Sequence, residues 1–226
     1  MDHHKGLSIS ADVEGFEDWT TYGHRPTPIF IPRFRNVTDK AKDFVRGYYV
    51  GGGASRRRQT DAAIGEDLKL AITEPGAWQI HLGPYGECLP YADNRVTLDH
   101  NKKDKWGRAV IAIDCEFKEN EKAMHEDMKI GASEMMEAAG FKNIQVTGSI
   151  SSPGNANHEM GTARMGNDPK TSVLNKWNQL HEVPNVFITD GSCMASSAWQ
   201  NPSLTYMALT ARACDYALGE MKRGNI

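Results

Sequence analysis

The sequence lacks any uninterrupted apolar run of about 18 residues, the length that a membrane-spanning helix requires. Its first ten residues, MDHHKGLSIS, also lack the apolar core of a secretory signal peptide. The formal net charge is −3, so the chain has no positive excess of the kind that attracts nucleic acids or anionic membranes. We therefore expect a protein with no membrane span and no nucleic-acid partner.

Cysteine is scarce and scattered. The four cysteines are Cys88, Cys115, Cys193 and Cys214, and they form neither a CxxC pair nor a cluster with histidine. This spacing predicts no zinc site and no other metal site, and it favours free thiols in a reducing compartment. A chain of 226 residues can bury enough surface to fold without a disulfide or a metal.

The glycine motifs that hold phosphate groups are missing too. Three consecutive glycines occupy positions 51–53, but neither GxGxxG nor GxxxxGK[ST] spacing surrounds them. We interpret the triplet as a bend in an antiparallel sheet, where glycine permits close backbone approach.

Residues 77–150 alternate between strand and helix patterns. Residues 77–90 and 94–117 predict strands, the latter forming an antiparallel hairpin across the polar, glycine-terminated segment NKKDKWG. A helix is predicted over residues 119–139, ending at Gly140, and a strand over 143–150. The apolar stripe expected on this helix consists of Met124, Met128, Ala132, Met135 and Ala139.

The last part of the chain predicts a strand followed by a long helix. NVFITDGSCM (185–194) predicts a buried strand that ends at Asp190 and Gly191. NPSLTYMALTARACDYALGEMKRG (201–224) predicts a helix with Asn201 as its cap and Pro202 in its first turn. The buried face expected for this helix consists of Leu204, Met207, Ala208, Ala211, Cys214 and Leu218.

One histidine stands in a setting suited to proton transfer. His158 opens the glycine-rich stretch HEMGTARMG (158–166), and glycine permits tight turns that let a bound group approach the main chain. The Asp190–Gly191 segment and the helix opening at Pro202 follow it in sequence. Strand ends and helix N-termini are places where α/β proteins bind anionic or electron-rich cofactors.

Three segments, HEMGTARMGNDPKTSVLN, NVFITDGSCM and NPSLTYMALTARACDYAL, resemble in order the C-terminal signature of the glucose–methanol–choline (GMC) oxidoreductases. The resemblance is strong over about residues 155–218. CLPYADNRVTLDHNKKDKWG (88–107) is similar to a segment of the family's substrate-binding region. The resemblance implies an FAD enzyme that oxidises alcohols, often sugars or polyols. It also implies an α+β fold: an antiparallel substrate-domain sheet packed with helices, plus the last strand and helix of an FAD-binding Rossmann-like domain.

The resemblance also implies roles for particular residues. His158 matches the family histidine that removes the substrate hydroxyl proton while hydride passes from carbon to flavin N5. Asn201 matches the second catalytic position, where its amide would hold the same oxygen. Asp190 and Gly191 would lie by the FAD. The start of the final helix, with Pro202 and Thr205, would favour negative charge on the reduced flavin.

One departure limits what this chain is expected to do alone. GMC enzymes begin with a GxGxxG unit that binds the ADP half of FAD, and this chain has none. We therefore expect a C-terminal portion, with a substrate-binding domain at 1–150 and the catalytic loop, final strand and final helix at 151–226. Its expected partners are an alcohol or sugar substrate and an N-terminal FAD-binding half. Alone, the chain is expected neither to hold FAD tightly nor to turn over, and to self-associate through exposed apolar surfaces.

Two alternatives remain at this stage. The chain could be a non-catalytic module that binds a sugar or a partner. It could also be a hydrolase that uses Ser192 or Cys193 as nucleophile, although DGSCM lacks the GxSxG elbow of such enzymes.

Overall fold

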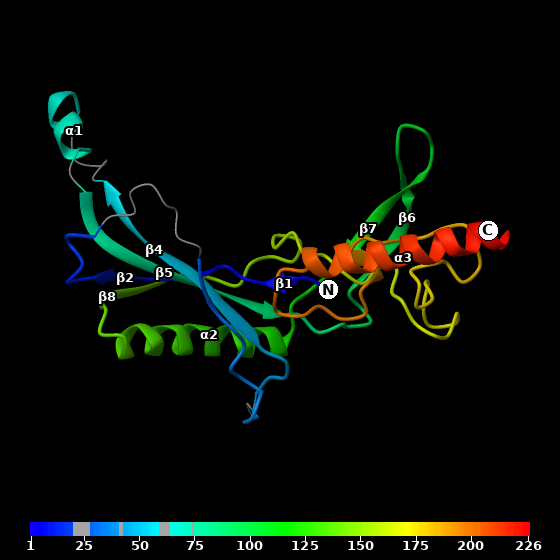
Figure 1. Ribbon diagram of the computed structural model, residues 1–226, viewed down its shortest axis with the longest axis horizontal. Coiled ribbons are helices and arrows are strands. Elements are labelled where there is room, and N and C mark those ends of the chain that lie inside the picture. Colours follow the sequence, from blue (N-terminus) through cyan, green and yellow to red (C-terminus); the bar gives the residue numbers. More distant parts are fainter. Residues whose placement is uncertain (20–27, 41–42, 59–63, 74) are drawn as a thin grey trace. The chain divides into compact units, whose positions relative to one another are not determined.

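The computed structural model describes the chain except for residues 20–27, 41–42, 59–63 and 74 (Figure 1). It divides into two compact units. One, the sheet unit, consists of Lys5–Gly86 and Lys122–Ile150, and the other, the loop unit, of Met1–His4, Glu87–Glu121 and Ser151–Ile226. The sequence led us to expect two uninterrupted ranges that meet at residue 150. In the structure, Glu87–Glu121 instead belongs to the same unit as the C-terminal segment.

The sheet unit is built on an antiparallel sheet with the strand order β3-β4-β5-β2-β8. The strands are β2 (Leu7–Val13), β3 (Ile29–Ile31), β4 (Tyr48–Arg58), β5 (Pro75–Glu87) and β8 (Lys142–Gly148). A short helix, α1 (Glu66–Ala71), precedes β5. Helix α2 (Glu119–Ala138) runs along one face of the sheet (Figure 1). This arrangement confirms the α+β class and the strands expected near 77–90 and 143–150.

The core of the sheet unit lies between α2 and the sheet. Leu7, Ile9 and Ala11 alternate along β2 and are buried there, because successive side chains of a strand point to opposite faces. They pack with the buried side chains of α2, which are Met124, Met128, Ala132 and Met136.

The predicted stripe on α2 was wrong at its C-terminal end. Met136 is 1% exposed and belongs to the core, whereas Met135 is only half-buried. Ala139 is exposed and lies beyond the helix, which ends at Ala138 before Gly140 at φ 79°. Both i+3 and i+4 from Ala132 lie on the same side of a helix, so the sequence could not choose between two adjacent methionines. Packing against the sheet selects the second.

The three glycines lie within β4, and their expected place in an antiparallel sheet is confirmed. Gly51, Gly52 and Gly53 pair without a register shift with Gly83, Leu82 and His81 of β5. A Cβ atom on Gly52 would lie 2.1 Å from the carbonyl oxygen of His81. Glycine at position 52 is therefore required by the close approach of the neighbouring strand.

The loop unit contains fewer regular elements. The predicted hairpin is confirmed as β6 (Arg95–Lys103) paired antiparallel with β7 (Ala109–Asp114). The unit also holds β1 (His3–His4), one turn of 3-10 helix (Gly191–Cys193) and the long helix α3 (Ser203–Arg223). Residues 151–190 form loops joined by isolated bridges such as Met165 with Leu174.

The buried strand predicted before Asp190 does not form. Phe187 makes a single bridge with Gln179, and Phe187 and Ile188 are only half-buried. A continuous apolar strand is stable in a sheet that covers it on both faces and pairs both its edges. In the described part of the loop unit, this segment has no such sheet around it and makes only the bridge between Phe187 and Gln179.

The buried face predicted for α3 was also wrong. Its six members, Leu204, Met207, Ala208, Ala211, Cys214 and Leu218, are all exposed, Leu204 to 79%. The face that packs instead carries Tyr206, Thr210, Ala213 and Tyr216. The Tyr216 ring stacks on Trp177 at 4.7 Å between centroids, and the Thr210 hydroxyl donates to the Thr189 carbonyl at 3.3 Å. The prediction chose the more apolar face of α3 as the buried one, and the structure shows that the opposite face packs.

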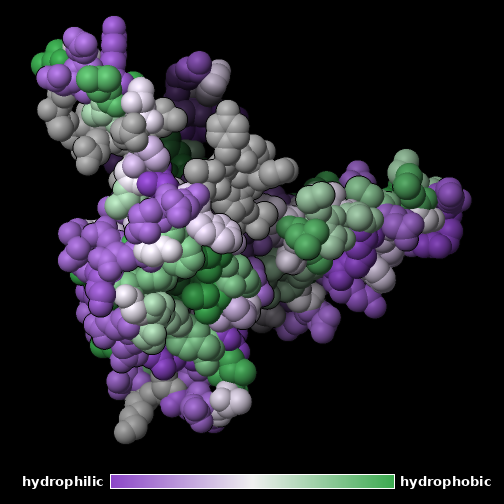
Figure 2. Space-filling view, turned by 60° about the vertical axis from the view of Figure 1, so that its left-hand side comes forward, coloured by the Kyte–Doolittle hydropathy of each residue, from purple (hydrophilic) through white to green (hydrophobic). Residues whose placement is uncertain are grey.

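Exposed apolar side chains occur elsewhere as well, and hydrophobic patches interrupt the hydrophilic surface in Figure 2. Among the described residues, no helix is both long and apolar enough to cross a membrane, and no group of three or more His, Cys, Asp or Glu side chains could hold a metal ion. All four cysteines are free thiols; Cys88 and Cys193 are buried and Cys214 is exposed.

Candidate active site

The glycine-rich loop that begins at His158 lies alongside the turn that follows Asp190. The backbone N–H groups of Gly161, Ala163 and Met165 donate to the carbonyls of Gly191, Ser192 and Cys193 at 3.3, 3.0 and 3.0 Å. Three alternate residues of the loop are therefore hydrogen-bonded to three consecutive residues of the turn. Two of the three segments singled out in the sequence are thus side by side.

Glycine is required within this loop at position 161. Gly161 has φ 90°, a conformation that side-chain-bearing residues rarely adopt. A Cβ atom there would also lie 2.6 Å from Cε of Met1 and 3.3 Å from the Met194 carbonyl oxygen. The turn at Gly161 is thus specified mainly by its backbone conformation, because the Met1 methyl group is the end of a flexible side chain.

The Asp190–Gly191 turn is held by its own side chain. The Asp190 carboxylate accepts a hydrogen bond from the Ser192 N–H at 2.9 Å and caps the short 3-10 helix. Gly191 is buried, and a Cβ atom there would lie 2.6 Å from the Glu159 carbonyl oxygen and 2.7 Å from the Tyr206 hydroxyl. Gly191 therefore allows the His158 loop, the turn and helix α3 to meet.

Helix α3 starts one residue later than predicted. Pro202 is its N-cap, with φ −88°, and no side chain caps the helix. Asn201 therefore precedes the N-cap and is exposed. The first helical hydrogen bond runs from the Tyr206 N–H to the Pro202 carbonyl at 3.0 Å. Residues 203–205 are exposed, and the first N–H groups of a helix have no partner within it.

His158 is half-buried and its imidazole meets a second imidazole. Its Nδ1 lies 2.9 Å from Nδ1 of His3, and the two rings meet edge to face at 4.9 Å between centroids. Nε2 of His3 makes a further contact with the carbonyl oxygen of Ala198. His3 therefore connects the His158 loop to the segment that leads into Asn201 and α3.

Sequence reasoning missed His3, together with the residue that holds it in place. Asp2 is 2% exposed, and its carboxylate accepts hydrogen bonds from the N–H groups of His3 and Gly154, each at 2.8 Å. The Met160 N–H donates to the Met1 carbonyl at 2.9 Å. Met1 and Asp2, which precede strand β1, thus contact residues on both sides of His158. A separation of 155 residues between the two histidines left no local pattern to detect.

Two side chains of the turn, Ser192 and Cys193, are poorly placed to act as nucleophiles. Burial raises the pKa of the Cys193 thiol and so disfavours its reactive thiolate. The Ser192 hydroxyl donates to the Asp190 carboxylate rather than to an imidazole. Burial also raises the pKa of Tyr206 to about 12, and nearby negative groups, including Glu159 and Asp190, act in the same direction. These contacts argue against the hydrolase alternative.

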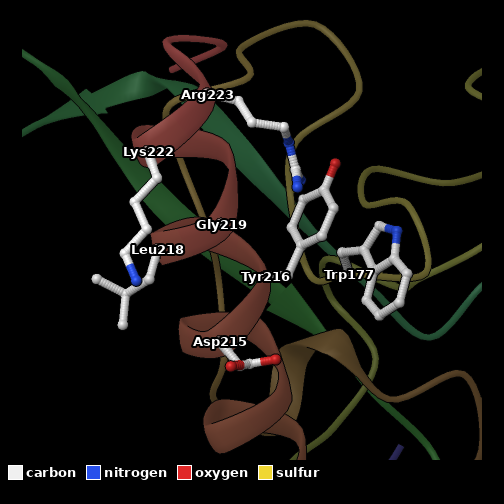
Figure 3. A pocket seen from close by; sticks show the side chains of 7 residues that line it. All are labelled: Trp177, Asp215, Tyr216, Leu218, Gly219, Lys222 and Arg223. Atoms are coloured by element: carbon white, nitrogen blue, oxygen red, sulfur yellow. The ribbon is translucent and has the colours of Figure 1, made fainter.

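One hollow of the loop unit lies away from these residues. It measures about 370 Å³ and is lined by Trp177 and by residues of the C-terminal half of α3, among them Tyr216, Lys222 and Arg223 (Figure 3). None of the predicted catalytic or cofactor residues lines it. The hollow is therefore separate from the convergence around His158.

Known proteins match the chain over most of these segments. A sequence profile described as GMC oxidoreductase matches residues 90–210, more than half of the chain. The 2-methyl-1,2-propanediol dehydrogenase of Mycolicibacterium austroafricanum is 36% identical over 173 residues, which are 75% of this chain and 28% of that enzyme. The fructose dehydrogenase large subunit of Gluconobacter japonicus is 29% identical over 161 residues, which are 71% of this chain and 29% of that subunit. Among solved structures, pyridoxine 4-oxidase from Mesorbium loti aligns with a TM-score of 0.46 and 18% identity, over 98% of this chain and 43% of that chain.

Proposed function

Because this chain belongs to the GMC oxidoreductase family, we propose that it forms the substrate-oxidising C-terminal portion of a flavin-dependent alcohol oxidoreductase. The two relatives described above are named for a diol and a sugar, which supports a small polyhydroxylated alcohol as substrate. The chain spans less than a third of the length of either relative. The activity therefore belongs to a larger assembly in which this chain supplies one part.

The observation that carries the proposal is the convergence of three separate segments. The His158 loop, the Asp190–Gly191 turn and the start of α3 meet around Gly191, which has no room for a Cβ atom. His158 stands at the edge of this convergence and is half-buried, so a substrate hydroxyl can reach it. A neutral imidazole can accept that hydroxyl proton. In this proposal, Asn201 donates its amide hydrogen bond to the same oxygen and keeps the alcohol oriented.

The residues present fit the flavin that the family implies. The first turn of α3, where residues 203–205 are exposed, carries backbone N–H groups and a partial positive charge, which suit an electron-rich ring or an anion. In the proposal, Pro202 and Thr205 border the flavin at this end, and Asp190 and Gly191 border it from the turn. When bound, FAD accepts the hydride released from the alcohol carbon. The chain's own contribution is to remove the proton and to hold the oxygen.

The exposed face of α3 supports a partner as part of the proposal. Leu204, Met207 and Leu218 are 79%, 68% and 57% exposed on this face. An apolar helix face of this kind is stabilised when another surface covers it. We assign that cover to the FAD-binding half, because the relatives have more than three times the length matched here. The chain alone is accordingly expected to bind FAD weakly and to be inactive.

The test compares two variants of the flavoprotein that joins this chain to an FAD-binding half. Reduction of the flavin by 2-methyl-1,2-propanediol or fructose is followed by the loss of its visible absorbance under anaerobic conditions. His158→Ala should slow reduction at least about a hundredfold, the scale of lost general-base catalysis. His181→Ala, at a half-buried histidine whose ring contacts the Ser172 hydroxyl, is the control and should leave the rate unchanged. A decrease of less than about fivefold in His158→Ala would assign the proton transfer to another group.

A further inference from the structure

We infer that His3 is a positioning residue that fixes the tautomer of His158, with the hydrogen on Nδ1 and the proton-accepting lone pair on Nε2. The inference rests on the 2.9 Å contact between the two Nδ1 atoms and on the contact of His3 Nε2 with the Ala198 carbonyl. Its catalytic meaning rests on the proposed role of His158 as base. The tautomer itself does not depend on that role.

The hydrogen positions follow from the chemistry of the three groups. A backbone carbonyl can only accept a hydrogen bond, so the hydrogen between His3 and Ala198 must belong to Nε2 of His3. A neutral imidazole carries one ring N–H, which leaves Nδ1 of His3 as an acceptor. The hydrogen between the two Nδ1 atoms must then come from His158.

Burial favours the neutral form of His3 on which this assignment depends. His3 is 0% exposed, and removing an imidazolium from water is costly. Asp2 precedes His3, and its carboxylate accepts from the backbone N–H groups of His3 and Gly154. His4 follows His3 on β1, and its buried ring packs against Phe117. His158 is the titratable group that faces its ring. A protonated His3 would donate from both nitrogens and would reverse the tautomer of His158.

The assignment gives His158 the protonation state that a base needs. With its hydrogen on Nδ1, the ring keeps an unprotonated Nε2 that can take a proton from an alcohol. The hydrogen bond to His3 also fixes the rotation of the ring and persists after His158 is protonated, because Nδ1 remains a donor. This is the function that a carboxylate performs in a catalytic triad, carried out here by a neutral side chain.

The two residues before β1, Met1 and Asp2, anchor His3 beside His158. The Asp2 carboxylate ties the backbone of His3 to Gly154, four residues before His158. The Met160 N–H, two residues after His158, donates to the Met1 carbonyl. The N-terminal segment that carries His3 is therefore hydrogen-bonded to the chain both before and after His158. These bonds keep Nδ1 of His3 next to the His158 ring.

The direct test is a long-range ¹H–¹⁵N correlation spectrum of the chain labelled with ¹⁵N-histidine, recorded at pH 8, where an ordinary imidazole is neutral. His158→Gln assigns the His158 resonances by their loss. We expect the pattern of a ring protonated on Nδ1. A pattern with the hydrogen on Nε2 of His158 would overturn the inference without any further variant.

Two substitutions of His3 separate orientation from packing. His3→Phe keeps a ring but removes the acceptor, and should shift His158 toward the Nε2–H tautomer. His3→Asn retains an oxygen acceptor close to the position of Nδ1, and should preserve the Nδ1–H tautomer. His100→Phe is the control for general effects on the histidine spectrum. An unchanged His158 pattern in a folded His3→Phe chain would show that another group fixes the tautomer.

The same variants in the flavoprotein connect the tautomer to catalysis. His3→Phe should slow flavin reduction at least about tenfold, and His3→Asn should recover most of the rate, because only the first loses the acceptor. If His158→Ala leaves the rate unchanged while the spectra show the expected tautomers, the proposed function fails and the orientation of His158 by His3 stands. If the spectra show the hydrogen on Nε2 of His158 while His158→Ala is inactive, His158 remains the proposed base and the role of His3 is refuted.

Discussion

The Tyr48 hydroxyl of β4 donates a hydrogen bond to the Asp127 carboxylate of α2 at 2.6 Å, inside the sheet unit. Arg35 donates to the same carboxylate oxygen at 2.9 Å. Tyr48 is 0% exposed, and burial together with the Asp127 charge raises the pKa of its hydroxyl. The pair therefore ties the helix to the sheet through a neutral donor and a charged acceptor.

Tyr48→Phe should destabilise the sheet unit by about 1.5–3 kcal/mol, the range for hydrogen bonds to charged groups. The ring would still fill its site, so the loss reports the hydroxyl alone. Amide hydrogen exchange in α2, followed by mass spectrometry, measures it locally. Tyr85→Phe on the neighbouring strand is the matched control and should change protection by less than about 0.5 kcal/mol. Equal effects of the two substitutions would contradict this role of Tyr48.

The two adjacent methionines of α2 should respond very differently to truncation. Met136→Ala removes a side chain that is 1% exposed and should cost about 2–4 kcal/mol, because it leaves a cavity in the core. Met135→Ala, at a half-buried position on the same turn, should cost less than about 1 kcal/mol. Urea unfolding of each variant gives the two free energies. A larger loss of stability for Met135→Ala than for Met136→Ala would mean that the apolar spacing of the sequence, and not the observed packing, identifies the buried methionine.

Two alanines on α3 distinguish its packed face from its open one. Ala213 is 1% exposed, so Ala213→Leu should destabilise the loop unit by about 1–3 kcal/mol through overpacking. Ala211 lies on the exposed face, and Ala211→Leu should be neutral within about 0.5 kcal/mol. Thermal unfolding followed by circular dichroism compares them, since both gain the same side chain. A larger loss for Ala211→Leu would restore the orientation expected from the sequence.

The Cys88 thiol should make folding stability depend on pH above neutrality. Burial, followed by the neighbouring Glu121 carboxylate, raises its pKa to about 12 from an ordinary value of 9.0. As the pH rises, the unfolded chain loses this proton first, so the contribution is intact below pH 9 and decreases between pH 9 and 12. One such group accounts for at most about 1.4 kcal/mol per pH unit.

Unfolding free energies of Cys88→Ala and the unchanged chain, measured from pH 8 to 11, test this linkage. The variant should show a shallower decrease above pH 9. Cys214→Ala, at the exposed cysteine, should follow the unchanged chain. Parallel curves for Cys88→Ala and the unchanged chain would show that the thiol does not contribute.

Much of the fold was predictable because its signals are local. The β6–β7 hairpin, helix α2 and helix α3 follow from residue spacing and from glycine at their ends. The residues that predict each of these elements lie within a few positions of one another. Over that distance, backbone geometry determines which side chains share a face. The buried strand before Asp190 failed for the opposite reason, because a strand needs neighbours that its own residues cannot supply.

The candidate site divides in the same way. The sequence by itself determined its segments: His158, the Asp190–Gly191 turn and the start of α3 are marked by motifs long enough to identify the family. Only the tertiary structure showed that His3 lies against His158, that Gly191 packs beneath Tyr206, and that the apolar face of α3 points outward. The physical reason is that a side chain's burial and hydrogen-bond partner depend on residues distant in sequence, which local periodicity does not encode.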